Sequence, residues 1–311
     1  MKTALVTGAS GFLGRALVAR LRGTGWRVAA AGRARSALPP ADYALRLPAP
    51  DAAAIGSALA GARIDLVFHC AAYGVNPADR DAAAMFAANV AAPAGWAEAA
   101  AALGARAFVH VGSCAEYGVA AQPRPIREDA PLAARDPYGA SKAAGGIWAR
   151  ARATALSLPL VWVRPFGIFG PGEAPHRLLP HLHARLRRGQ RAKLTPGAQM
   201  RDFLHVDDAA AGLAAAGEAA LSGFAGECNL CSGRPVSVRA FAEAAAQLMG
   251  AGGALLDFGA QDYRPGETMW MVGDPARLAA ATGFRPALSL EDGIARTIAA
   301  LDAASMREAA Q

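Results

Sequence analysis

Residues 3–14 read Thr-Ala-Leu-Val-Thr-Gly-Ala-Ser-Gly-Phe-Leu-Gly, and this stretch decides the fold. An apolar run typical of a buried parallel strand precedes the first glycine, and apolar side chains at helical spacing follow the third. Gly8 permits a tight turn, Gly11 lets the main chain approach a pyrophosphate, and Gly14 lets the helix pack closely on the strand. Because the helix N-terminus then faces the phosphates, the pattern predicts a dinucleotide-binding unit with the spacing G-x-x-G-x-x-G.

A second predicted strand, residues 27–31, indicates which dinucleotide is bound. It ends in Gly32-Arg33-Ala34-Arg35. NAD-selective sites usually place an acid here for the ribose 2′-hydroxyl, whereas an arginine accommodates a 2′-phosphate. Arg33 and Arg35 therefore favour NADP(H). NAD(H) stays open, because arginines are frequent throughout the chain.

A tyrosine and a lysine stand four residues apart in Tyr138-Gly-Ala-Ser-Lys142. Residues at this spacing share one helix face, and a nearby ammonium lowers the pKa of a phenol, which is ordinarily about 10. A tyrosine tuned in this way suits general acid–base catalysis near neutral pH. Together with the glycine motif, the pair predicts that a nicotinamide exchanges hydride with a substrate while Tyr138 moves the proton.

Several further segments carry a family resemblance over nearly the whole chain. They resemble the extended short-chain dehydrogenase/reductase superfamily, in its nucleotide-sugar branch of epimerases, dehydratases and 4-keto reductases. The segments at 201–208 and 264–267 are the most specific, because generic reductases of this superfamily generally lack them. The segments are His69-Cys-Ala-Ala72, Asn89-Val90, Ser113-Cys-Ala-Glu-Tyr-Gly118, Arg164-Pro-Phe-Gly-Ile-Phe-Gly-Pro171, Arg201-Asp-Phe-Leu-His-Val-Asp-Asp208 and Arg264-Pro-Gly-Glu267.

The resemblance implies a role for each site residue. Ser113, Tyr138 and Lys142 form the catalytic set, in which Ser113 holds the substrate carbonyl or alcohol beside Tyr138. Asn89 matches a structural asparagine of the family. The implied cofactor contacts are Gly8, Ser10, Gly11, Phe12, Leu13, Gly14, Arg33, Arg35, Ala71, Ala72, Lys142, Pro165 and Ile168. The implied substrate contacts are Ser113, Cys114, Tyr138, Gly167, Arg177, Leu178, Arg201 and Arg264.

Two departures from the family pattern narrow the chemistry. In 4,6-dehydratases of this branch, an Asp-Glu pair follows the serine or threonine and serves water elimination. Cys114 and Ala115 stand there instead, so dehydratase activity is not expected, and Glu116 is expected to point elsewhere. Gly167 replaces an asparagine that often touches the substrate phosphates, so this contact cannot come from a side chain at residue 167.

Alternation of strands and helices from residue 3 to about 165 predicts a parallel sheet covered on both faces. The expected fold is α/β, a doubly wound parallel Rossmann sheet with a smaller interleaved α+β substrate-binding lobe. We expect residues 1–169 and about 203–222 in the NADP-binding domain. The lobe is expected to hold about 170–202 and 223–311.

Composition excludes several functional classes. The 311 residues carry a net charge of +7, but the arginines are scattered and no nucleic-acid motif is present. Residues 1–6 look like a strand rather than a signal peptide, and no charge-free apolar stretch reaches membrane-spanning length, so a cytoplasmic protein is expected. Cys228-Asn-Leu-Cys231 lacks the further ligands that zinc needs, and we expect two strand cysteines and no metal.

The leading hypothesis is NADPH-dependent reduction of a 4-keto nucleotide-diphosphate sugar, expected to be 6-deoxy, to the 4-hydroxy sugar. An NAD-dependent nucleotide-sugar epimerase uses the same three residues and is the first alternative. A non-catalytic NADP-binding sensor is the second. A reductase of aldehydes or flavonoid-like ketones also stays open, since fold does not fix substrate.

A homodimer is expected through the helices that begin near Asp81 and Tyr138. Each carries more apolar surface than one sheet face can cover, and a contiguous apolar patch marks an interaction site. The resemblance also implies a dimer seam of four helices. The apolar residues concerned are Met85, Phe86, Val90 and Trp96 on the first helix and Ile147 and Trp148 on the second.

Overall fold

The computed structural model describes residues 1–309 apart from 48, 77, 80 and 119–122. Its centre is a parallel seven-stranded sheet with the order β10-β6-β5-β4-β1-β2-β3, which confirms the predicted fold class. The strands are β1 (Thr3–Thr7), β2 (Arg27–Gly32), β3 (Tyr43–Arg46), β4 (Leu66–His69), β5 (Ala107–Val111), β6 (Leu160–Pro165) and β10 (Gly226–Leu230).

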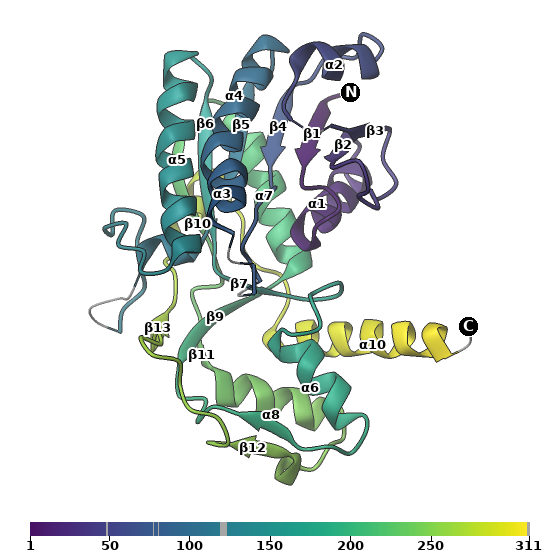
Figure 1. Ribbon diagram of the computed structural model, residues 1–311, viewed down its shortest axis with the longest axis vertical. Coiled ribbons are helices and arrows are strands. Elements are labelled where there is room, and N and C mark those ends of the chain that lie inside the picture. The colour runs from purple at the N-terminus through teal and green to yellow at the C-terminus, as the bar shows by residue number, and fades with distance from the viewer. Residues whose placement is uncertain (48, 77, 80, 119–122, 310–311) are drawn as a thin grey trace.

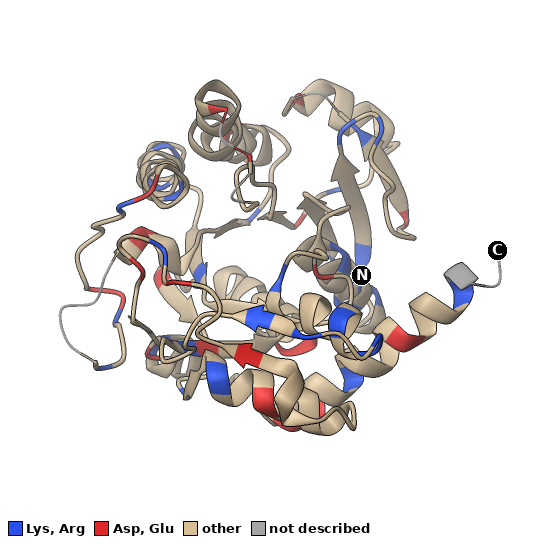
Figure 2. Cartoon of the chain, turned by 60° about the horizontal axis from the view of Figure 1, so that its bottom comes forward, with Lys and Arg blue, Asp and Glu red and all other residues tan. Residues whose placement is uncertain are grey.

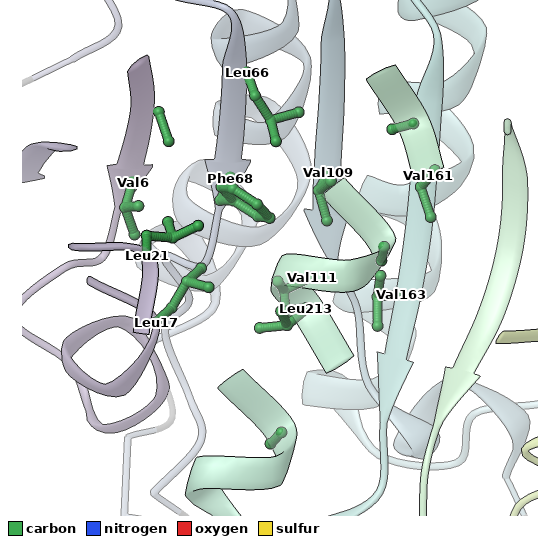
Figure 3. Close-up of a cluster of buried hydrophobic side chains, with 14 of the residues drawn as sticks. Val6, Leu17, Leu21, Leu66, Phe68, Val109, Val111, Val161, Val163 and Leu213 are labelled. Atoms are coloured by element: carbon green, nitrogen blue, oxygen red, sulfur yellow. The ribbon is translucent and has the colours of Figure 1, made fainter. Parts of the chain in front are cut away.

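Helices cover both faces of this sheet (Figure 1). On one face, strand residues such as Phe68 and Val109 pack against Leu17 of α1 and Leu213 of α7 (Figure 3). On the other face, α2, α4 and α5 cover Phe108 and Trp162. The covering helices are α1 (Phe12–Gly23), α7 (Val206–Leu221) and α9 (Ala276–Thr282) on the first face, and α2 (Ala52–Ala58), α3 (Ala82–Phe86), α4 (Ala92–Ala102) and α5 (Pro137–Ala155) on the second.

A smaller lobe occupies the lower half of Figure 1. Its strands β7, β11 and β13 pair with β9, while β12 pairs with β8. Its core includes Phe169, Leu182, Phe241 and Ile294. The elements are β7 (Gly167–Phe169), α6 (Leu178–Leu186), β8 (Ala192–Leu194), β9 (Met200–His205), β11 (Pro235–Ser237), α8 (Val238–Leu248), β12 (Leu256–Phe258), β13 (Trp270–Met271) and α10 (Leu290–Ala309).

The chain crosses between the two parts more often than we expected. We placed residues 223–311 in the lobe, but β10 is the edge strand of the large sheet, where Asn229 pairs with Arg164 of β6. Helix α9 packs beside α7 and β10. Cys228 and Cys231 are buried, free thiols at this edge. A short strand looks the same in sequence whichever sheet it joins, so only the tertiary pairing reveals the boundary.

Glycines determine how closely the first helix and the loop after β4 approach β1. Gly8 has a φ of +63°, and a Cβ there would lie 2.6 Å from the amide nitrogen of Ala71. A Cβ on Gly14 would lie 2.2 Å from the carbonyl oxygen of Gly8. Only glycine fits either position, and these contacts bring the helix N-terminus to the carboxyl ends of the strands, where ligands bind in such sheets.

Candidate active site

The predicted catalytic serine and tyrosine meet at the carboxyl end of β5. Ser113 follows that strand by two residues, Tyr138 lies in the first turn of α5, and their side chains share a hydrogen bond. Ser113 Oγ also accepts a hydrogen bond of 3.1 Å from the amide of Ala115, at the start of a short 3-10 helix, Cys114–Tyr117. A hydroxyl and a phenol are thus presented together, as one substrate oxygen would require.

Lys142 lies one helical turn beyond Tyr138, and its side chain is buried. Its Nζ donates a hydrogen bond of 2.7 Å to the carbonyl oxygen of Val111, the last residue of β5. Burial lowers the pKa of Lys142 to about 8, although the charges of Glu116 and Cys70 oppose that shift. The three predicted catalytic residues are therefore gathered around the end of one strand.

The protonation state of Tyr138 differs from our expectation. Burial raises its pKa, while the hydrogen bond with Ser113 works in the opposite direction. The prediction that Lys142 lowers this pKa is wrong for this structure, because the lysine directs its ammonium to Val111 and desolvation dominates at the phenol. The raised pKa favours the protonated form of the Tyr138 phenol.

Asn89 holds the loop after β4 against α5, the helix that carries Tyr138. It lies fully buried in a π-helical turn, Ala87–Ala91. Its side chain exchanges two hydrogen bonds with the main chain of Tyr73, of 2.9 and 2.8 Å, and donates a third of 2.9 Å to Ser141 Oγ. Ser141 in turn donates to the Tyr138 carbonyl oxygen at 2.8 Å. The structural role implied for Asn89 thus has a concrete geometry.

The residues at the start of α1 fit a dinucleotide phosphate. Gly11 is the N-cap of α1 and supplies no side-chain cap, so the first N–H groups of the helix are free for an anion. A Cβ on Gly11 would lie 3.2 Å from the Gly8 carbonyl oxygen, a tight contact that glycine avoids in this turn. Thr7 Oγ1 and His69 Nδ1, 2.8 Å apart, tie β1 to β4, from which Ala71 and Ala72 follow.

Arg33 and Arg35 lie exposed in the loop after β2. Two further arginines, which sequence reasoning missed, hold that loop in place. Arg15 of α1 donates a hydrogen bond of 2.7 Å to the carbonyl oxygen of Ala37. Arg46 of β3 donates a hydrogen bond of 2.6 Å to the carbonyl oxygen of Ser36. Four arginines therefore lie on or against the loop where a ribose 2′-phosphate is expected. Elsewhere, Figure 2 shows basic and acidic residues distributed over many elements rather than gathered on one face.

Two of the predicted substrate-binding arginines, Arg177 and Arg201, stabilise the thiolate of Cys114 electrostatically, although burial dominates and raises the pKa of Cys114 to about 12. Arg201 on β9 is paired with Glu267 at 2.6 Å. Arg177, just before α6, is paired with Glu173 at 3.1 Å. Each arginine is thus held in place by a carboxylate while lying within electrostatic reach of the residue next to Ser113.

The remaining predicted contacts are placed as follows. Arg264 is exposed. It begins a turn that is closed by a hydrogen bond of 2.9 Å from the amide of Glu267 to the carbonyl oxygen of Arg264. Leu178 begins α6, and Pro165 and Ile168 flank the step from β6 to β7. A Cβ on Gly167 would lie 2.6 Å from the Asp202 carbonyl oxygen, so the main chain of β9 packs directly against this glycine.

A buried ion pair behind Ser113 was not predicted as part of the site. Glu116 and Arg164 lie 2.8 Å apart, and their side chains are 0% and 3% exposed. The Glu116 carboxylate thus points toward Arg164, and its expected direction away from the substrate stays a prediction. Its pairing depends on the neighbouring strands β5 and β6 and leaves no local signal in the sequence.

The chain is similar to known proteins. The model of the family "NAD dependent epimerase/dehydratase" matches residues 4–230. The chain belongs to this family. Among the described residues, no group of three His, Cys, Asp or Glu side chains is placed to hold a metal ion. None of the helices in the described part is both long enough and apolar enough to span a bilayer.

Curated relatives cover several reactions on nucleotide sugars. The UDP-glucose 4-epimerase of Mycolicibacterium smegmatis is 29% identical, over 94% of this chain and 96% of that enzyme. The dTDP-6-deoxy-L-talose 4-dehydrogenase (NAD(P)(+)) of Kitasatospora kifunensis is 30% identical, over 93% and 92%. The dTDP-glucose 4,6-dehydratase of Streptomyces griseus is 33% identical, but the match spans only 63% of this chain and 58% of that enzyme.

Solved structures match the whole chain. MoeE5 in complex with UDP-glucose and NAD has a TM-score of 0.83 and 28% identity, and the match covers 99% of this chain and all of that one. The UDP-glucose 4-epimerase of Thermus thermophilus with NAD has a TM-score of 0.83 and 25% identity, with 97% and 99% covered. The chain is thus related to NAD(P)-dependent nucleotide-sugar enzymes.

Proposed function

We propose that this protein reduces the 4-keto group of a nucleotide-diphosphate sugar, of the 6-deoxy class, with NADPH. One combination of features carries the proposal. Tyr138, whose phenol pKa is raised by burial, is hydrogen-bonded to Ser113, and the cofactor loop after β2 carries Arg33 and Arg35 where an NAD-selective site has an acid.

Each catalytic residue has a separate task. A bound nicotinamide supplies the hydride that carbon 4 receives. Tyr138 donates its phenolic proton to the sugar oxygen, and Ser113 hydrogen-bonds the same oxygen. We assign to Lys142 a contact to the nicotinamide ribose, since its ammonium is buried one turn from Tyr138.

Two arginines suit the diphosphate of the substrate. Arg177, just before α6, and Arg201, on β9, belong to the lobe and lie within electrostatic reach of Cys114, so we infer that a nucleotide extending away from Ser113 would pass them. Guanidinium groups recognise phosphate oxygens by strong, charge-assisted hydrogen bonds. We therefore assign both to the diphosphate, and we assign Arg264 to the nucleotide end.

One relative and two residues of this chain favour reduction at carbon 4 over water elimination. The Kitasatospora enzyme is named for oxidoreduction at position 4 of a dTDP-6-deoxy sugar with NAD(P), and it matches almost the full chain. Several relatives are dehydratases. However, Cys114 and Ala115 supply neither the acid nor the base that elimination requires.

The second candidate is a nucleotide-sugar 4-epimerase that keeps NAD bound. The solved neighbours favour it, since their structures contain NAD, and the Mycolicibacterium relative carries that name. The same Ser113, Tyr138 and Lys142 would serve both directions of hydride transfer. The cofactor that copurifies with the protein separates the two candidates.

A thermal-shift panel tests the proposal. A ligand that binds the folded state raises the melting temperature by mass action. We expect NADP to raise it more than NAD at equal concentration, and a dTDP- or UDP-sugar to add a further rise with NADP present. Tightly bound NAD in the purified protein, with no response to NADP, would instead favour the epimerase.

A further inference from the structure

A buried network of hydrogen bonds links the main chain of Ser113 to β6 and β10. The two carboxylate oxygens of Glu116 accept from two different donors. Oε1 accepts from the amide of Ser113 at 2.8 Å, and Oε2 accepts from Nε of Arg164 at 2.8 Å. Arg164 also donates a hydrogen bond of 3.0 Å to the hydroxyl of Tyr117. That hydroxyl in turn donates a hydrogen bond of 2.7 Å to Asn229 Oδ1.

The geometry points to Glu116 as a positioning residue: its carboxylate, held by Arg164, fixes the main chain of Ser113 and so aims the serine hydroxyl at the substrate oxygen. This inference rests on the role that the proposed function gives to Ser113. Glu116 itself lies behind the serine and does not reach the substrate position.

A carboxylate is required at residue 116 because two donors face it. Neither the Ser113 amide nor the Arg164 guanidinium can accept a hydrogen bond in return. A glutamine has only one accepting oxygen, so it satisfies one donor and turns its NH₂ group toward the other. The buried site offers no solvent to compensate, since both charged side chains are at most 3% exposed.

The same pair joins the serine to the cofactor side of the site. Arg164 directly precedes Pro165 at the end of β6, and its guanidinium lies 4.2 Å from the centre of the Trp162 ring. The serine loop after β5 and the segment expected along the nicotinamide are therefore braced against one another. The charge of Glu116 also raises the pKa of Lys142.

A double-mutant cycle tests whether Glu116 acts through the serine. We expect Glu116→Gln to lower kcat by roughly 10- to 100-fold through misplacement of the serine, with KM for NADPH little changed. In a Ser113→Ala background the same change should cost less than about 3-fold, because the hydroxyl to be aimed is absent. Losses that multiply in the double variant would overturn the proposal.

A rescue variant guards against simple loss of folding. Glu116→Gln leaves the Arg164 charge unpaired, which is costly in a buried site. In the double variant Glu116→Gln/Arg164→Gln, the amide oxygen introduced at residue 164 takes the place of Nε and accepts from the new NH₂ group at residue 116. The amide oxygen at residue 116 is then free to accept from the Ser113 amide.

Turnover of this double variant above that of Glu116→Gln alone supports the proposal. Equal or lower turnover, in protein that binds NADPH normally, contradicts it. Glu98→Gln, which removes the exposed ion pair with Arg152, is the matched control and should leave turnover unchanged.

Failure of the proposed function would be recognised separately. If the wild type reduces no 4-keto sugar but epimerises a UDP-sugar, the same cycle applies to that reaction. If it does neither, hydrogen exchange at the Ser113 amide decides. Faster exchange in Glu116→Ala than in wild type supports the positioning role, and unchanged exchange refutes it.

Discussion

The ammonium of Lys142 donates its hydrogen bond to the carbonyl oxygen of Val111, at 2.7 Å, at the end of the central strand β5. A fully buried charge at this position is unfavourable for folding, because burial lowers the lysine pKa from 10.5 to about 8. The proposed catalytic lysine therefore lowers the stability of the fold, a trade-off that is common at functional sites.

Lys142→Met should make the protein more stable at pH 7 and less active. The pKa shift corresponds to about 3 kcal/mol of unfolding free energy. Loss of the bond to Val111 offsets about 1 kcal/mol of it, so we expect a net gain of about 2 kcal/mol. Below about pH 8 the lysine is protonated in both states and the full difference is present. As the pH rises from about 8 to 10.5, the folded wild type loses its proton first and the difference shrinks.

Urea unfolding at pH 7 and pH 10 measures this difference. A Lys142→Met variant that is less stable than wild type at pH 7, or a difference that does not change with pH, would show that the buried ammonium carries no such cost.

Gly146→Ala should destabilise the protein, although alanine is the better helix former. A Cβ at residue 146 would lie 2.0 Å from the ring of Trp162, so α5 would have to move off the sheet. We expect a loss of about 1–3 kcal/mol, the usual cost of overpacking. Gly23→Ala, in helix α1 with open space around it, is the control and should be neutral or stabilising by up to about 1 kcal/mol. Equal effects of the two substitutions in thermal unfolding would contradict this packing argument.

Arg33→Asp should shift cofactor preference from NADPH toward NADH. The change removes a partner of the 2′-phosphate and supplies an acceptor for the ribose hydroxyl. Arg63→Asp alters the overall charge equally, but this exposed residue precedes β4, at the amino-terminal ends of the strands, so the preference should stay as in wild type. The kcat/KM ratio for the two cofactors is the measurement. A wild type that already prefers NADH would overturn the assignment of this loop.

Exposed apolar side chains on α3 and α5 should form a homodimer interface. Phe86, Ile147 and Trp148 are 62%, 48% and 50% exposed. Met85 and Trp96, which we had counted in this patch, are instead buried within the chain. Trp148→Glu should yield a monomer of 31.7 kDa by light scattering, while Leu248→Glu, at an exposed position in the lobe, should not. A monomeric wild type at micromolar concentration would refute the interface.

The sequence predicted those features that depend on local geometry. The glycines at 8, 11 and 14 indicate a turn that is typical of a dinucleotide-binding unit, and the spacing of Tyr138 and Lys142 places both on one helix face. The order of strands and helices then predicts the doubly wound sheet.

Features that depend on tertiary pairing could not be predicted in this way. Glu116 and Arg164 are 48 residues apart and meet only because β5 and β6 are neighbours. The same is true of β10, whose place beside β6 is a matter of sheet order. The direction of the Lys142 side chain follows from the nearby end of β5, which periodicity in the sequence cannot show.

The most direct test of the proposed function is NADPH consumption with a dTDP-4-keto-6-deoxy sugar, followed by its absorbance, in wild type and Tyr138→Phe. We expect the wild type to oxidise NADPH and form the 4-hydroxy sugar. The variant should turn over at least about 100-fold more slowly, the usual cost of losing a general acid, while its NADPH affinity is largely kept. Undiminished turnover in Tyr138→Phe would remove the tyrosine from the mechanism. A wild type that consumes no NADPH with any 4-keto nucleotide sugar, yet interconverts UDP-sugars with bound NAD, would contradict the reductase assignment.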